Sequence, residues 1–238
     1  MGAKRSIGTR LATQVAPRLA PKLAPKLAGA APGVSASFVR EALHRAVDGV
    51  GPFQPAHLTA RRALEEHEGD VRKAVHAVVD DHVRFAGAAG FVTNLGGLVT
   101  LTVTLPANLT GLAVLQCRMV AAVAHLRGYD IQDPRVHNAI LVTTLGADAV
   151  DGLIKQRRLP APPMAIATAP VHDASLDQAI ASAVAAELIA RVAGRRLATT
   201  AGRRVPVVGG LVGMGADGWA TWKIGRYAER EFLPRAPR

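Results

Sequence analysis

The longest apolar segment of the chain runs from Phe85 to Cys117 without a single charged residue. Its 33 positions are interrupted only by uncharged polar residues and by Pro106. A segment of this length either enters a bilayer or forms the buried centre of a helical domain. Most of the functional interpretation depends on which of these two alternatives holds.

We expect this segment to form two antiparallel helices joined at Pro106, because proline interrupts the interior of a helix. Asn108 is a suitable N-cap for the second helix, which should end at Gly128. Glycines in the first helix would allow close contact with a neighbouring helix. The segment therefore predicts a central hydrophobic helical hairpin.

Apolar residues recur at helical spacing on both sides of this hairpin. Residues 159–170 contain four prolines and are expected to form a loop. Ser175 and Gln178 resemble a capping box at the start of a long helix. The stop and start signals place further helices near residues 35–48, 57–68, 70–83, 133–145, 148–156, 175–197 and 217–232. Paired strand signals are lacking, so the predicted fold class is all-α.

A second uncharged segment, residues 205–216, is rich in glycine. Its order does not match a P-loop, which requires Lys followed by Ser or Thr. Small residues at this spacing let two helical backbones approach closely. We therefore expect a glycine-rich C-terminal helical segment that packs against another helix through Gly209, Gly210, Gly213 and Gly215.

The amino-terminal 33 residues differ in composition from the rest of the chain. A unit Ala-Pro-Lys/Arg-Leu occurs three times there, and prolines four residues apart exclude a regular helix. The segment has no continuous apolar stretch typical of a secretory signal. It contains six basic residues and no acidic one: Lys4, Arg5, Arg10, Arg18, Lys22 and Lys26. The predicted organisation is a flexible basic arm, 1–33, followed by one helical domain, 34–238.

The formal net charge of +11 allows an anionic partner, either a lipid surface or a nucleic acid. Aromatic residues make up only 4% of the chain, too few to interleave with basic residues for base stacking, so nucleic-acid binding is not expected. Contact with an anionic membrane surface would use the arm together with Arg195, Arg196, Arg203 and Arg204. The alternatives are a simple linker and a charge that serves solubility.

The side chains that could support catalysis or metal binding form no recognisable motif. None of the eight histidines belongs to a His-Glu-x-x-His sequence, so neither a metal site nor a cofactor is expected. The chain has no Gly-x-Ser-x-Gly nucleophile motif. Its one cysteine, Cys117, is interpreted as a buried thiol.

Two polar features interrupt the apolar segments and define a candidate binding cluster. The sequence His125-Leu-Arg-Gly-Tyr129-Asp130 closes the long apolar helix, and Asp217 follows twelve uncharged residues. A buried carboxylate needs a partner, and Arg118 is the only charge inside the apolar helix, so we hypothesise an Asp217–Arg118 pair. Catalysis would require Asp217 to share one pocket with His125 and Asp130.

Two separate motifs resemble the EcsC family. One is Leu115-Gln-x-Arg-Met-Val-Ala-Ala-Val-Ala-His-Leu-Arg-Gly-Tyr-Asp130, and the other is Arg204-Val-Pro-Val-Val-Gly-Gly-Leu-Val-Gly-x-Gly-Ala-Asp217. The resemblance covers about residues 38–233. It implies a bacterial, mainly helical protein of a family named after a gene beside an ABC-transporter operon linked to secretion. It implies no established enzymatic activity and no agreed catalytic residues.

We expect a non-enzymatic, membrane-associated protein that is cytoplasmic and peripheral at the inner face of the cell membrane. Its partner would be an anionic membrane lipid or a membrane protein, with a link to transport or secretion. Glycines and threonines within 86–105 argue against a stable membrane span. The alternatives are a soluble all-α scaffold or ligand-binding module, and an enzyme that uses His125, Asp130 and Asp217.

Overall fold

The computed structural model describes residues 35–49, 54–95, 101–201 and 206–235, without the side chains of 90–110 and 192–214. Over these described ranges the chain is helical and forms no strand, which confirms the all-α prediction. The helices are α2 (Ala36–Asp48), α3 (Ala56–Glu66), α4 (Val71–Leu95), α5 (Leu101–Leu126), α6 (Pro134–Thr143), α7 (Ala147–Lys155), α8 (Pro163–Ala167), α9 (Ala174–Ala201) and α10 (Pro206–Glu231).

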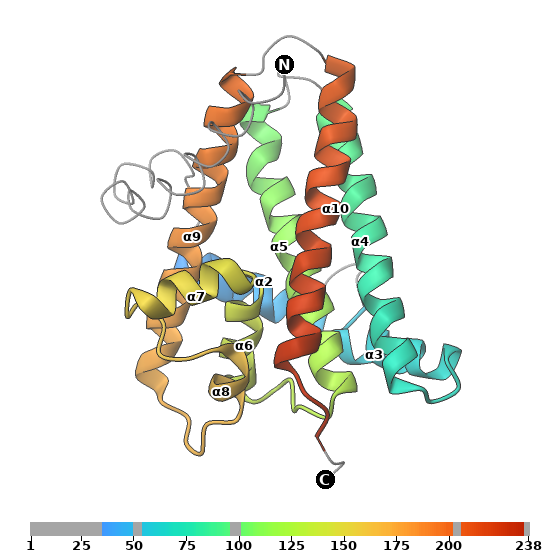
Figure 1. The fold of residues 1–238 in the computed structure, drawn as a ribbon, viewed down its shortest axis with the longest axis vertical. Helices are drawn as coiled ribbons and strands as arrows, with labels where there is room; N and C mark the ends of the chain where they lie inside the picture. Colours follow the sequence, from blue (N-terminus) through green and yellow to red (C-terminus); the bar gives the residue numbers. More distant parts are fainter. Residues whose placement is uncertain (1–34, 50–53, 96–100, 202–205, 236–238) are drawn as a thin grey trace, which may run out of the picture.

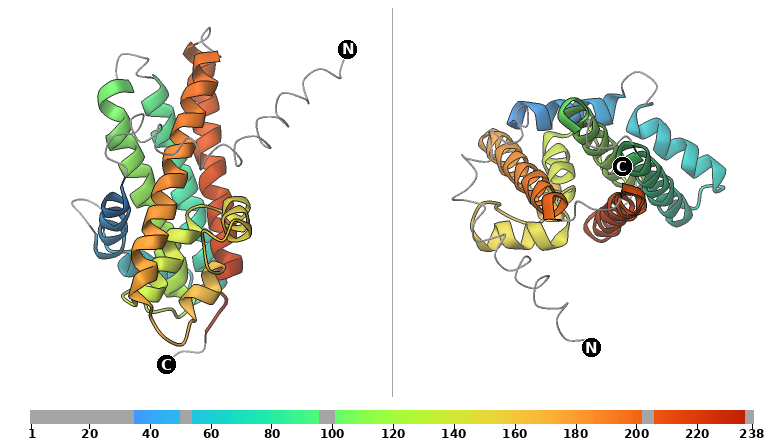
Figure 2. Two further views of the ribbon diagram at one scale, coloured as in Figure 1. Left: turned by 90° about the vertical axis from the view of Figure 1, so that its left-hand side faces the viewer. Right: turned by 90° about the horizontal axis from the view of Figure 1, so that it is seen from above.

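Four long helices, α4, α5, α9 and α10, run along the long axis of the molecule (Figure 1). The shorter helices surround only one half of them, the half that also holds the C-terminus (Figures 1 and 2). At the opposite end, the last turns of α4 and α9 and the first turns of α5 and α10 lie together (Figure 1). We call that end the helical tip and the half with the short helices the base.

Local side-chain chemistry sets most of the helix ends in the base. Ser35, Asp70 and Asp133 each accept a hydrogen bond from the main-chain N–H two or three residues further on. These bonds satisfy N–H groups that lack a partner at a helix start. Gly69 and Gly128 both have a φ of 84°, a conformation that glycine adopts without strain. The helix starts predicted near residues 35, 70 and 133 and the stop predicted at Gly128 are confirmed.

The predicted helix break at Pro106 is wrong. Helix α5 passes through Pro106, and Asn108 lies inside that helix instead of capping it. The preceding helix ends at Leu95, immediately before Gly96 and Gly97 in the sequence. Two glycines cost roughly 2 kcal/mol of helix propensity relative to alanine. Pro106 is the sixth residue of α5, where it removes one main-chain hydrogen bond and crowds the preceding turn without ending the helix.

Two further local predictions are corrected. Helix α8 lies within residues 159–170, which were expected to form a loop. Pro162 is its N-cap and Pro163 its first residue, where the missing proline N–H would have had no partner in any case. At the start of α9, Asp173 takes the role predicted for Ser175. Its carboxylate accepts hydrogen bonds from the N–H and hydroxyl of Ser175, at 2.9 and 2.7 Å.

Helix α10 runs without interruption through its glycines, antiparallel to α4 (Figure 1). Close contact with α4 is made by Gly218 and Gly225, which the prediction did not name. A Cβ atom on Gly225 would lie 2.5 Å from Cγ1 of Val79, and one on Gly218 would lie 3.6 Å from the carbonyl oxygen of Val83. Gly215, which was expected to pack, faces open space. The remaining glycines of the prediction lie outside the described side chains: Gly209, Gly210 and Gly213.

The second half of α5 forms the centre of the core. Every residue from Met119 to Ala124 has an exposed fraction of 0%. Cys117 is also buried, and burial raises the pKa of its thiol to about 12. The thiol is therefore protonated at neutral pH, which agrees with its interpretation as a buried, unreactive cysteine. Val114, Leu115 and Gln116 are buried as well, so the base-proximal end of the long apolar segment is part of the interior of a helical domain.

His82 on α4 is buried, and its Nδ1 donates a hydrogen bond of 2.7 Å to the carbonyl oxygen of Val78. Burial lowers the pKa of His82, with a smaller contribution from the positive charge of Arg118. The folded protein therefore keeps this histidine neutral, whereas the unfolded chain takes up a proton near pH 6.5. The contribution of neutral His82 to the free energy of unfolding is therefore fully present above about pH 6.5, and it is lost as the pH falls below that value.

We predict that His82→Asn weakens this acid sensitivity, because asparagine can keep the hydrogen bond to Val78 but does not titrate. Urea unfolding at about pH 7.5 and about pH 5.5, followed by circular dichroism, measures the difference in unfolding free energy. That difference should be smaller in the variant than in the unaltered protein. The exposed His44, changed to Asn in parallel, serves as the control. If His82→Asn showed the same difference in unfolding free energy between the two pH values as the unaltered protein, His82 would not be the source of the acid sensitivity.

Candidate functional site

His125, Tyr129 and Asp130 gather at the C-terminal end of α5, as the sequence cluster predicts. Gly128 ends the helix, and the N–H of Tyr129 donates a hydrogen bond of 3.0 Å to the carbonyl oxygen of Ala124. This turn brings all three residues onto a cavity of about 800 Å³ in the base. Other segments add lining residues that the sequence analysis did not single out: His57, Arg135 and Arg235.

The rings of His57 and His125 meet edge to face, with centroids 6.3 Å apart. Burial lowers the pKa of His125, and the nearby His57 lowers it further. Neutral His125 can therefore accept or donate a hydrogen bond at neutral pH. Over the part of the chain that the structure describes, no three His, Cys, Asp or Glu side chains are grouped as a metal ion would require.

Tyr129 anchors the C-terminal segment to the base. Its ring is buried and packs edge to face against Phe232, with centroids 5.1 Å apart. The guanidinium of Arg235 lies 5.2 Å from the centroid of the Tyr129 ring, and its main-chain N–H donates to the carbonyl oxygen of Arg127. Burial raises the pKa of Tyr129, so its hydroxyl stays protonated at neutral pH. These contacts give Tyr129 a structural role.

The structure does not bring Asp217 or Arg118 into this cavity. Asp217 is buried on α10, fifteen residues before Phe232, which corresponds to roughly 20 Å along the helix. Arg118 is half-buried on α5 and donates to the hydroxyl of Thr59 at 2.7 Å. The Asp217–Arg118 pair stays a prediction. The geometry does not support an enzyme that combines Asp217 with His125 and Asp130.

The predicted anionic-surface residues fall mostly outside the described residues. Arg195 and Arg196 belong to the last turns of α9, where the structure describes the backbone alone. The others lie in undescribed segments: Lys4, Arg5, Arg10, Arg18, Lys22, Lys26, Arg203 and Arg204. Contact with an anionic surface therefore stays a prediction.

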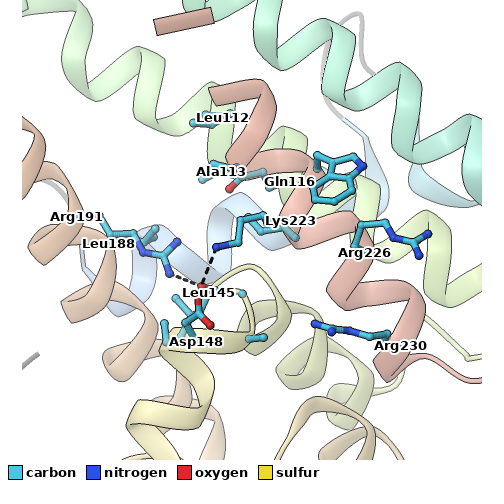
Figure 3. Close-up of a pocket in the computed structure, with 16 residues that line it drawn as sticks. Leu112, Ala113, Gln116, Leu145, Asp148, Leu188, Arg191, Lys223, Arg226 and Arg230 are labelled. Atoms are coloured by element: carbon cyan, nitrogen blue, oxygen red, sulfur yellow. Dashed lines mark hydrogen bonds and ion pairs between the residues drawn. The ribbon is translucent and has the colours of Figure 1, made fainter. Parts of the chain in front are cut away.

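A second cavity, of about 610 Å³, lies between α5, α7, α9 and α10 (Figure 3). Four cationic side chains line it, Arg191 from α9 and Lys223, Arg226 and Arg230 from α10. The sequence analysis missed this site. The spacing of the three α10 residues places them on one helix face, a signal that was present in the sequence. Their position opposite Arg191 depends on how the fold places α9 and α10 on two sides of one cavity.

The cations of this second cavity are held in different ways. The Lys223 ammonium lies 3.3 Å from the carboxylate of Asp148. Arg191 donates to the main-chain carbonyl of Leu145. The guanidinium of Arg230 lies 5.6 Å from the centroid of the Tyr227 ring. The guanidinium of Arg226 pairs with the carboxylate of Glu229, so within the described part of the chain only Arg230 among the four cations has an aromatic ring in place of an oxygen partner.

Comparison with protein families identifies a single large region of similarity. The family model described as "EcsC protein family" matches residues 38–236, which is most of the chain. This match confirms the resemblance predicted for residues 38–233. No curated protein and no solved structure matches the chain.

Proposed function

The chain belongs to the EcsC protein family, and on this premise we propose that it is a non-enzymatic protein that binds peripherally to a membrane through its helical tip. A role beside a membrane transport or secretion system would fit such a protein. The observation that carries the proposal is the way in which the charge-free ends of several helices coincide in space.

Toward the tip, the charged residues of α4 and of α10 end at the same level along the long axis of the molecule. On α4, Arg84 is the last charged residue, and on α10 Asp217 is the first. A Cβ on Gly218 would lie 3.6 Å from the carbonyl oxygen of Val83 and 3.8 Å from Cα of Gly87. The two charge boundaries therefore face each other, and both helices continue from there to the tip without a charge (Figure 1).

Helix α5 follows the same pattern, because it carries no charge before Arg118. The side chain of Gln116 donates to the hydroxyl of Thr221 at 3.2 Å, which places the lower part of this charge-free segment beside α10. Three helices that are each charge-free toward one end thus converge on the same end of the molecule.

Aromatic side chains mark this boundary on the surface. Trp219 and Trp222 are 60% and 39% exposed, and their rings stack with centroids 4.8 Å apart. Phe85, the first residue after the charge boundary of α4, is 52% exposed. Tryptophans gather where an apolar segment meets water, since the ring is apolar and its N–H is polar. This pattern is typical of a surface at the level of lipid headgroups.

The lengths of the apolar stretches in the helices favour association with the membrane surface. Within the described residues, no helix has an apolar stretch long enough to cross a membrane. Arginines in the last turns of α9 and the basic residues of the amino-terminal arm supply positive charge. Each such residue near an anionic surface contributes roughly 1 kcal/mol of binding free energy. The apolar tip and the basic residues together favour shallow, charge-dependent binding.

Flotation with vesicles tests this proposal directly. The full-length protein should bind vesicles that contain phosphatidylglycerol more strongly than neutral phosphatidylcholine vesicles, and salt should weaken the binding. We expect Trp219→Glu to reduce binding to anionic vesicles at least about tenfold, because it places a carboxylate at the apolar boundary.

Val171→Glu is the matched control, because Val171 is 77% exposed and lies three residues before α9, whose first turn is at the opposite end of the molecule (Figure 1). Its binding to anionic vesicles should equal that of the unaltered protein. Equal losses in the two variants would indicate a general charge effect and contradict the assignment to the tip. Absence of binding to anionic vesicles at low salt would refute the proposed function itself.

A further inference from the structure

We infer that the cavity between α5, α7, α9 and α10 binds a single-chain anionic lipid. The acyl chain would lie against the apolar walls, and the anionic head would lie on the cationic side chains. The inference is independent of membrane binding by the tip, because it concerns a ligand taken up from solution.

The walls of the cavity fit an acyl chain. Leu112 from α5, Leu145 and Ala149 from around α7, Leu188 from α9 and Ile224 from α10 all line it. Ten of its sixteen lining residues are apolar or glycine, so a compact polar ligand would leave most of the wall without a matching partner. Its volume of about 610 Å³ lies within the usual range of small-molecule sites, about 300–1,000 Å³.

The charges of the cavity fit an anionic head. Four cations and one carboxylate, that of Asp148, line it, and two of the cations, Arg191 and Arg226, also contact Glu187 and Glu229 outside the lining. Figure 3 shows Arg191 and Lys223 approaching each other from α9 and α10, while Arg226 and Arg230 follow along α10. Arginine and lysine bind carboxylate and phosphate oxygens through charge-assisted hydrogen bonds. The side chains that line the cavity therefore carry a net positive charge, which favours an anionic head over a neutral one.

The cations are available to a ligand. In the Lys223–Asp148 pair the side chains are 52% and 91% exposed, and exposed ion pairs of this kind contribute little to stability. Lys223 can therefore turn toward a bound anion at small cost. Arg191 is held between Glu187 and the carbonyl of Leu145, so its position is already set before binding.

Tryptophan fluorescence offers a direct test, because Trp222 lines the cavity and the chain contains only two tryptophans. In the full-length Trp219→Phe variant, fluorescence comes from Trp222 alone. A brominated stearate, added below its micelle concentration and without vesicles, should quench this fluorescence in a saturable way. Unlabelled palmitate and a lysophosphatidate should each be tried as competitors, and displacement by either supports the inference and identifies the preferred head.

The charge dependence is tested with Lys223→Gln combined with Arg230→Gln. We expect a loss of affinity for the anionic lipid of at least about tenfold, because two head-binding groups are removed. The control is Arg72→Gln with Lys73→Gln on exposed positions of α4, which removes the same charge elsewhere and should leave affinity unchanged.

Two results would overturn the inference. One is the absence of saturable quenching by the brominated stearate. The other is equal displacement by an uncharged monoacylglycerol of the same chain length, which would show that the cations do not select the head. Because no vesicle is present, either result leaves the proposed binding of the tip to membranes untouched, and a failure of flotation leaves this inference untouched.

Discussion

Replacing Phe232 with alanine is expected to lower the free energy of unfolding by about 3–5 kcal/mol. The Phe232 side chain has an exposed fraction of 0% and is among the largest fully buried side chains of the described core. It also packs edge to face against the ring of Tyr129. The same Tyr129 ring contacts the guanidinium of Arg235. The change removes buried surface, leaves a cavity and releases the C-terminal segment from the base.

Urea unfolding, followed by circular dichroism, measures this effect. Leu233→Ala is the matched control, because the neighbouring side chain is 50% exposed, and it should cost less than about 1 kcal/mol. Phe232→Leu should fall between the two, since it keeps apolar volume but loses the aromatic contact. If Phe232→Ala were no more harmful than Leu233→Ala, the packing described at the base would be incorrect.

Replacing Gly225 with valine is expected to lower the free energy of unfolding by about 2–3 kcal/mol. The Cβ atom alone would lie 2.5 Å from Cγ1 and 3.0 Å from Cγ2 of Val79. Valine is stiff about its first side-chain torsion, so Val79 cannot turn away, and α4 and α10 would have to separate. The gain in helix propensity over glycine is smaller than this cost.

Two companion variants identify the cause. Gly215→Ala lies on the same helix with no atom within 4 Å of the added Cβ, and it should stabilise the protein by roughly 0.5–1 kcal/mol. Combining Gly225→Val with Val79→Ala should cost clearly less than the sum of the two single changes, because the deleted methyl groups make room for the added ones. Strict additivity would show that the two residues do not touch.

Short-range signals were the most reliable part of the sequence interpretation. The N-caps Ser35, Asp70 and Asp133 and the stop at Gly128 depend on hydrogen bonds within a few residues, so local sequence suffices to place them. The predicted break at Pro106 was wrong because a proline at the sixth position of a 26-residue helix removes only one of its many main-chain hydrogen bonds. Its position in the helix depends on where α5 begins, which proline alone does not reveal.

The candidate site also combines residues that local sequence predicts with residues that it does not. His125, Tyr129 and Asp130 lie within six consecutive residues, so a single turn brings them together and the sequence could predict it. Their neighbours His57 and Arg235 come from distant parts of the chain and carry no local signal. The supposed union with Asp217 failed because α10 carries that carboxylate toward the tip, away from the turn after α5.

By itself, the sequence determined the all-α class, the family, most helix ends and the presence of long charge-free segments. Composition and periodicity encode these properties locally, since burial of apolar residues at helical spacing requires little knowledge of the neighbours. Only the tertiary structure decided that the charge-free ends of α4, α5 and α10 share one end of the molecule, and that Arg191 and Lys223 line the same cavity. Helix packing decides these relationships because it brings together residues that are far apart along the chain, and no local pattern specifies which faces will meet.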